Sequence, residues 1–131
     1  MNIPDVLRRP TNISTITAKD VIAAVRRLAD NSPNCQYKPP DRDNGVKVCF
    51  NKEGECTNGS TGCIVGQALV ELFGADKVPN EGGVATCVSD LQIRATPQQY
   101  SWLQVVQGRQ DNGCPWEFAV EQADEYYPLE V

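Results

Sequence analysis

The sequence contains no histidine, so it lacks the side chain most often used as a general base and any Ser–His or Cys–His pair. It also lacks the G-x4-G-K-[ST] phosphate loop and the G-x-G-x-x-G turn of dinucleotide-binding proteins. No stretch approaches the roughly 18 consecutive apolar residues that a membrane-spanning helix requires. From these absences we predict a protein that is not an enzyme, holds no cofactor and has no membrane partner.

Six cysteines are present, but none of their spacings is the C-x2-C pair typical of structural zinc sites. Residues 1–10 have no apolar signal core, which predicts a protein kept in a reducing cytoplasm, where disulfides are disfavoured. We therefore predict reduced thiols, several of them buried, and no bound metal. Two alternatives stay open: a reactive thiolate at a helix start, or a four-thiolate zinc site. The first concerns Cys63 and Cys114, and the second concerns Cys49, Cys56, Cys63 and one other cysteine.

Charge is unevenly spread along the chain. Residues 1–50 hold eight Lys and Arg against five Asp and Glu, a net of +3, and residues 51–131 hold four against twelve, a net of −8. The acidic part argues against a nucleic-acid partner, because phosphates are neutralised by a concentrated basic surface. It is compatible with a basic protein partner, with simple solubility, or with a mimic of nucleic acid.

One apolar segment, residues 62–73, is predicted to be the central helix. Its apolar side chains fall at helical spacing over nearly the whole circumference, and Gly74 is placed to end it with a left-handed cap. Gly62 and Gly66 are spaced so that another backbone can approach the helix closely, which we interpret as packing. We predict Thr61 as the N-cap and burial of the apolar residues as far as Leu72 and Phe73.

The rest of the pattern predicts an α+β, mainly α fold, with four to five helices and a small antiparallel hairpin at about 46–57. Side chains that alternate at a period of two predict a strand over 46–50, and residues 35–38 are a candidate third strand. The expected helices are marked by caps and apolar spacing over about 17–30, 84–91, 96–112 and 114–127. The predicted organisation is an N-terminal arm (1–16), one globular domain (17–127) and a C-terminal tail (128–131).

Two charged groups and several aromatic side chains are candidates for binding a partner. Trp102 lies off the predicted apolar face of its helix, so an exposed anchor and core packing are equally open. The tyrosine pair at 126–127 is either an interaction patch or an anchor for the C-terminus. The predicted partner-binding residues are Arg8, Arg9, Arg26 and Arg27 on one side, Glu121, Asp124 and Glu125 on the other, and Trp102, Tyr126 and Tyr127.

Three stretches of the sequence resemble small uncharacterised proteins of actinobacterial phages, particularly mycobacteriophages. They are Gln36–Pro40, Gly62–Leu69, and Thr96–Gln99 with Trp102, continuing to Gln110–Trp116 and Ala119–Val120. The resemblance implies a phage protein acting in the cytoplasm of the infected bacterial host, and it supplies no catalytic residue. The leading hypothesis is therefore a non-enzymatic protein that binds and modulates a host or phage protein. The alternatives are a cysteine-based metalloprotein or enzyme, and an acidic mimic of nucleic acid.

Overall fold

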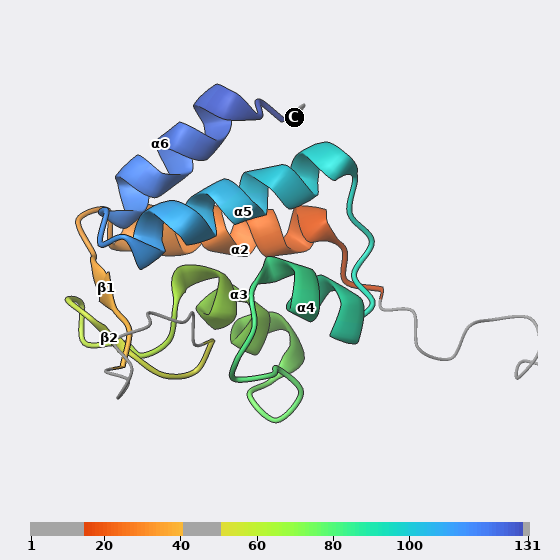
Figure 1. Ribbon diagram of the computed structural model, residues 1–131, viewed down its shortest axis with the longest axis horizontal. Coiled ribbons are helices and arrows are strands. Elements are labelled where there is room, and N and C mark those ends of the chain that lie inside the picture. Colours follow the sequence, from red (N-terminus) through yellow and green to blue (C-terminus); the bar gives the residue numbers. More distant parts are fainter. Residues whose placement is uncertain (1–14, 41–50, 130–131) are drawn as a thin grey trace, which may run out of the picture.

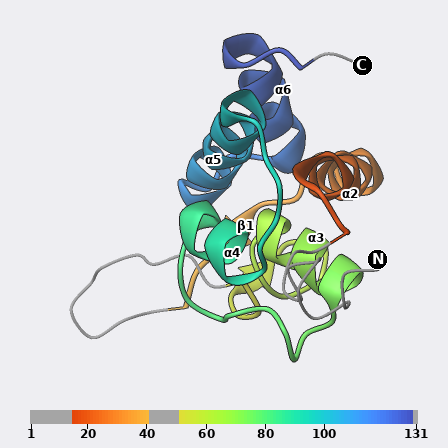
Figure 2. The same cartoon turned by 90° about the vertical axis from the view of Figure 1, so that its right-hand side faces the viewer.

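A computed structural model describes residues 15–40 and 51–129, which contain five helices and two short strands. Helix α6 forms an upper layer, α2 and α5 lie beneath it, and α3, α4 and the strands form the lowest layer (Figures 1 and 2). The predicted α+β, mainly α class is confirmed. The elements are α2 (Ala18–Asn31), β1 (Tyr37–Lys38), β2 (Glu55–Cys56), α3 (Ile64–Phe73), α4 (Val84–Asp90), α5 (Pro97–Asp111) and α6 (Trp116–Tyr126).

The N-terminus of α2 lies at the predicted N-cap Thr17, where the structure shows a capping box with Asp20. The backbone N–H of Thr17 donates to the carboxylate of Asp20 at 2.9 Å, and this carboxylate also faces the positive end of the helix dipole. The inner face of the helix buries Val21 and Val25. Residues 1–14 of the predicted arm lie outside the described part of the chain.

The sheet is smaller than the predicted hairpin and has a different partner within the described residues. Tyr37 pairs with Cys56 and Lys38 with Glu55 in an antiparallel register. Thus the segment predicted only as an additional strand is the observed partner of residues 55–56. The expected strand at 46–50 lies outside the described residues.

Helix α3 is buried in the core, as predicted, but its N-cap lies two residues after the expected one. Cys63 is the N-cap instead of Thr61, because its thiol accepts the Gly66 N–H at 3.3 Å. Burial is complete only along the first half of the helix, and Leu72 and Phe73 are partly buried, contrary to the prediction. Two turns of α3 therefore supply most of its contribution to the core.

The interpretation of the glycine pair as a packing feature is confirmed. An ideal Cβ on Gly66 would lie 2.3 Å from the carbonyl oxygen of Asn51, and one on Gly62 would meet the same atom at 2.3 Å. Asn51 is 2 % exposed and donates from its backbone N–H to the carbonyl of Asn80 at 2.8 Å. The two glycines allow the buried backbone at residue 51 to lie directly on α3.

Helix α5 shares the central position with α3, since it packs against α2, α3, α4, α6 and β1. The predicted capping box holds its start: Thr96 Oγ1 accepts the N–H of Gln99 at 3.1 Å, and the Gln99 side chain accepts the N–H of Thr96 at 2.9 Å. Pro97 occupies the first helical position. Two faces of α5 are consequently covered by neighbours.

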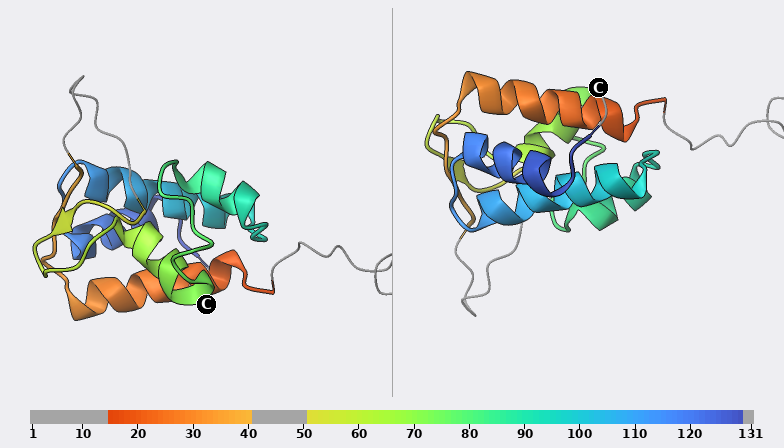
Figure 3. Two further views of the ribbon diagram at one scale, coloured as in Figure 1. Left: turned by 90° about the horizontal axis from the view of Figure 1, so that it is seen from below. Right: turned by 90° about the horizontal axis from the view of Figure 1, so that it is seen from above.

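Helix α6 follows a turn at Gly113 and lies across α2 and α5, as the view from above shows (Figure 3). Trp116, Ala119 and Ala123 form its buried side. Beyond the helix, Leu129 packs partly buried against the core. Among the described helices, none has both the length and the apolar character needed to cross a bilayer.

Candidate functional site

Two of the four arginines predicted as a basic face, Arg26 and Arg27, are engaged in ion pairs. Arg26 donates two hydrogen bonds to the Asp124 carboxylate, at 2.7 and 2.8 Å, and Arg27 pairs with Glu71. The prediction that Arg26 and Asp124 belong to separate charged surfaces is therefore wrong. The two residues are 98 positions apart in the sequence, so local patterns do not predict the contact, which forms because α6 folds back over α2. Arg8 and Arg9 lie outside the described residues.

The prediction of Trp102 as an exposed anchor is also wrong, and the alternative of core packing is confirmed. The side chain is 0 % exposed, because α6 and α2 cover the side of α5 from which it projects. Its indole N–H donates to the carboxylate of Asp124 at 2.8 Å, and the Arg26 guanidinium lies 4.9 Å from the ring centroid. These three side chains join three helices in one polar clamp.

Electrostatics stabilise the ionised form of this clamp. The hydrogen bonds from Arg26 lower the pKa of the Asp124 carboxyl, partial burial opposes that shift, and the bond from Trp102 adds to it. The pKa of Arg26 is raised by the same hydrogen bonds. A carboxylate with its lone pairs occupied in this way is poorly suited to proton transfer, so the clamp has a structural role.

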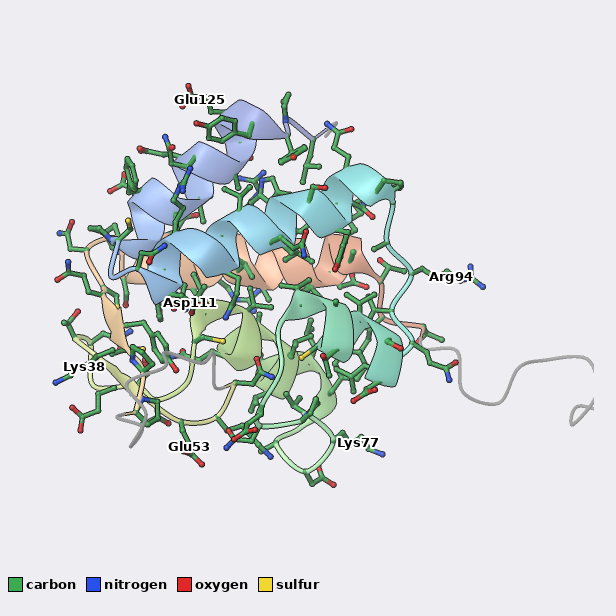
Figure 4. The ribbon with its side chains drawn as sticks, viewed as in Figure 1. Lys38, Glu53, Lys77, Arg94, Asp111 and Glu125 are labelled. Carbon is green, nitrogen blue, oxygen red and sulfur yellow. The ribbon has the colours of Figure 1, made fainter. Side chains whose placement is uncertain are left out.

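The remaining predicted residues lie together on the outer side of α6. Glu121, Glu125 and Tyr126 are exposed there, and Tyr127 is exposed at the C-cap. The structure adds Phe118, which is 42 % exposed, and Glu117, neither of which sequence reasoning selected. Glu125 projects from the upper edge of the molecule, away from the other layers (Figure 4). We call this surface the acidic–aromatic face; it consists of Glu117, Phe118, Glu121, Glu125, Tyr126 and Tyr127.

Two parallel rows make up the acidic–aromatic face. One row contains three carboxylates at four-residue spacing, and the row beside it begins with Phe118 and ends with Tyr126, with the partly buried Gln122 between them. All three large apolar side chains that are exposed within the described residues belong to this face: Phe118, Tyr126 and Tyr127. The four-residue spacing was the signal in the sequence that could have identified Phe118 and Glu117.

The carboxylate row works against the stability of the helix that carries it. Like charges four residues apart destabilise a helix by ~0.2–0.5 kcal/mol per pair, and the row contains two such pairs. Glu125 lies in the last turn, where the helix dipole disfavours an anion, and no basic residue accompanies it there. Within residues 15–40 and 51–129, none of the three carboxylates forms an ion pair. Glu117 is favourably placed in the first turn of α6, and Gln122 donates a hydrogen bond to Glu125 at 3.2 Å, so the uncompensated part of the arrangement is the repulsion along the row and the position of Glu125 at the negative end of the helix dipole.

An arginine already contacts the aromatic row from the neighbouring helix. The guanidinium of Arg109 lies 5.9 Å from the centroid of the Tyr126 ring, which is 59 % exposed. Cations bind the face of an aromatic ring because the ring quadrupole is negative there. The contact shows that this ring is oriented so that it can receive a guanidinium.

The buried cysteines have the properties of packing residues. Burial raises the pKa of the Cys56 thiol to about 12 and that of Cys87 to about 11, so both stay protonated at neutral pH. Cys63 donates to the Asn51 side chain at 3.4 Å, which in turn donates to Cys87 at 3.2 Å. The described residues include no group of three or more potential ligands arranged for a metal ion, and Cys49 lies outside them.

A surface hollow of about 570 Å³ lies between α3 and residues 51–61. Its polar groups already bond to the protein itself. Gln67 donates to Ser60 and to the Gly62 carbonyl, at 2.9 and 3.0 Å, and Lys52 donates to the Ala75 carbonyl at 3.0 Å. This hollow therefore offers few unused groups to a ligand.

A search of protein-family models, curated proteins and solved structures finds no match to this chain.

Proposed function

We propose that the protein is a non-enzymatic binding protein that uses the acidic–aromatic face of α6 to bind and modulate another protein. The observation that carries this proposal is the collection of all exposed large apolar side chains of the described residues on one helix and its C-cap. Aromatic residues are frequent energetic anchors in protein interfaces, and scattered single residues would be the ordinary surface arrangement.

The resemblance of three sequence stretches to proteins of actinobacterial phages gives the proposal its setting. In that setting the protein acts in the cytoplasm of an infected bacterium, and its partner is a host or phage protein. The modest size of the face, which is one helix of 11 residues with its C-cap, fits a regulatory contact better than an obligate assembly.

The alternatives have less support. The raised thiol pKa values of Cys56 and Cys87 oppose chemistry at those two residues. Of the two cysteines predicted as reactive thiolates, Cys63 is completely buried and Cys114 is partly exposed. A mimic of nucleic acid would have to present many more carboxylates than the single row of three, since DNA-binding proteins commonly contact about 6–10 phosphates. The exposed aromatic row also has no counterpart on a phosphate backbone.

The test is photo-crosslinking in a lysate of an actinobacterial host. A photoreactive phenylalanine analogue replaces Phe118 in one variant and Lys77 in the control, which lies at the opposite end of the molecule (Figure 4). We expect a discrete crosslinked protein from position 118 alone. Unlabelled wild type should compete with the crosslink, and a Phe118→Ser/Tyr126→Ser variant should not. Equal crosslinking from both positions, or none from position 118, would contradict the proposal.

A further inference from the structure

We infer that the partner presents a basic amphipathic helix to the acidic–aromatic face, with Arg or Lys repeating every four residues beside an apolar row. This inference rests on the proposed function and specifies the chemistry of the partner. It is carried by the spacing of the rows on α6, by the charges of the described residues and by the contact between Arg109 and Tyr126.

The spacing of the rows matches the repeat of a second helix. Residues four apart are separated by about 6 Å along an α-helix, so both rows of α6 are about 12 Å long. The i, i+4 ridges of one helix pack against the corresponding ridges and grooves of another. A helical partner can thus place a cation opposite each carboxylate and apolar side chains against Phe118 and Tyr126, on either side of Gln122.

The charge of the face selects the sign of that partner. Glu117, Glu121 and Glu125 repel one another along the row and form no ion pair within the part of the chain that the structure describes. A row of cations removes this repulsion on binding, and it also offsets the unfavourable position of Glu125 at the end of the helix dipole.

The aromatic row makes arginine the preferred cation. Tyr126 already receives the guanidinium of Arg109 at 5.9 Å, and the residue is still 59 % exposed. A guanidinium stacks on an aromatic ring and bonds to a carboxylate at the same time, whereas an ammonium is a more strongly hydrated point charge. Neighbouring carboxylates and rings are therefore matched to arginine.

The same charges disfavour other occupants of the face. A second copy of the chain would bring two carboxylate rows together, and a bilayer with anionic lipids would repel them. Both occupants are included as outcomes of the test below.

The experiment measures binding of three synthetic helical peptides, each of about five turns, to the full chain by fluorescence anisotropy. The first carries Arg every four residues beside a Leu row. The second has the same composition in scrambled order, and the third replaces each Arg with Glu. We expect the first peptide to bind at least about tenfold more tightly than the second, and the third not to bind. Raising the salt concentration should weaken binding of the first peptide.

Two variants with the same change in net charge locate the site. The triple variant Glu117→Gln/Glu121→Gln/Glu125→Gln should lose about tenfold in affinity for the first peptide. The control replaces three exposed carboxylates outside α6, and its affinity should stay within about twofold of wild type. That control is Asp76→Asn/Glu81→Gln/Asp90→Asn.

Three results would overturn the inference. The first is equal binding of the arginine peptide and its scramble, and the second is an unchanged affinity in the triple glutamine variant. The third is self-association of the chain, or its binding to anionic vesicles, if the triple glutamine variant changes that association or binding. Failure of the proposed function is distinguishable from these results. If the crosslink from position 118 maps to a neutral or acidic segment of a captured protein, the inference fails while the proposed function holds.

Discussion

Gly66→Ala is the substitution whose effect the structure predicts most directly. A methyl group at this position would lie 2.3 Å from the carbonyl oxygen and 2.4 Å from the Cα of Asn51, both of which are backbone atoms. Ordinary contacts of a Cβ begin near 3.4 Å, so the backbone at residue 51 would have to retreat by roughly 1 Å.

That retreat is resisted by the hydrogen bonds that hold Asn51. Its N–H donates to the carbonyl of Asn80 at 2.8 Å, and its side chain donates to the carbonyl of Pro79 at 2.7 Å. Overpacking against a fixed neighbour costs about 1–3 kcal/mol, and weakening one of these hydrogen bonds costs about 1 kcal/mol more. Alanine regains up to about 1 kcal/mol through its higher helix propensity. We expect a net loss of about 1–3 kcal/mol of unfolding free energy.

The matched control is Gly108→Ala, the same substitution in the interior of α5. A Cβ at Gly108 has no neighbour within 4 Å, so only the gain in helix propensity remains. We expect Gly108→Ala to stabilise the protein by about 0.5–1 kcal/mol. Urea unfolding followed by far-UV circular dichroism measures both variants. If Gly66→Ala is as stable as wild type while Gly108→Ala behaves as expected, the backbone of Asn51 does not lie against α3.

Three further predictions concern titratable groups. Asp124→Asn should lower the free energy of unfolding by about 0.5–1 kcal/mol near pH 7. The difference from wild type should shrink in acid, because the ion pair with Arg26 lowers the pKa of Asp124 in the folded state and its stabilisation is lost as pH falls through that value. An equal difference at neutral and acidic pH would contradict this. Asp111 has a pKa raised to about 6 by burial, so wild type should lose stability as pH rises from about 4 to 7, and Asp111→Asn should remove up to about 2–3 kcal/mol of that loss in pH-dependent unfolding experiments. Among the described cysteines, Cys114 should react first with a thiol reagent at pH 7.5, because the others are buried; labelling of Cys56 before Cys114, located by peptide mass spectrometry, would show that the core opens there.

Local signals in the sequence predict most of the fold. The capping boxes at Thr17 and Thr96 each involve residues three apart, so they can be read without knowing the tertiary structure. The apolar spacing of α3 likewise predicts burial. Pairing of Tyr37 with Cys56 depends on contacts across 19 positions, and periodicity does not specify such a pairing.

The site was only partly predictable for the same reason. The charge and aromatic character of Glu121, Glu125 and Tyr126 indicate a binding role, and the three residues are exposed. The position of Trp102 depends on which neighbours cover α5, and helical spacing contains no information about a second covered face. Phe118 lies outside the buried row of α6, where a single exposed apolar residue is an ordinary surface feature. It gains significance only when it is considered together with Tyr126, which lies eight positions later along the same row.

The carboxylate row on α6 has a consequence for competition experiments. A helix of 11 residues is marginal in water, and two like-charge pairs with an acidic last turn weaken it further. Released from the buried contacts of Trp116, Ala119 and Ala123, the segment would be mostly unfolded and would present no ordered rows. An isolated α6 peptide should therefore compete poorly with the full chain for the partner. Loss of tertiary structure would abolish binding even though the residues that contact the partner are unchanged.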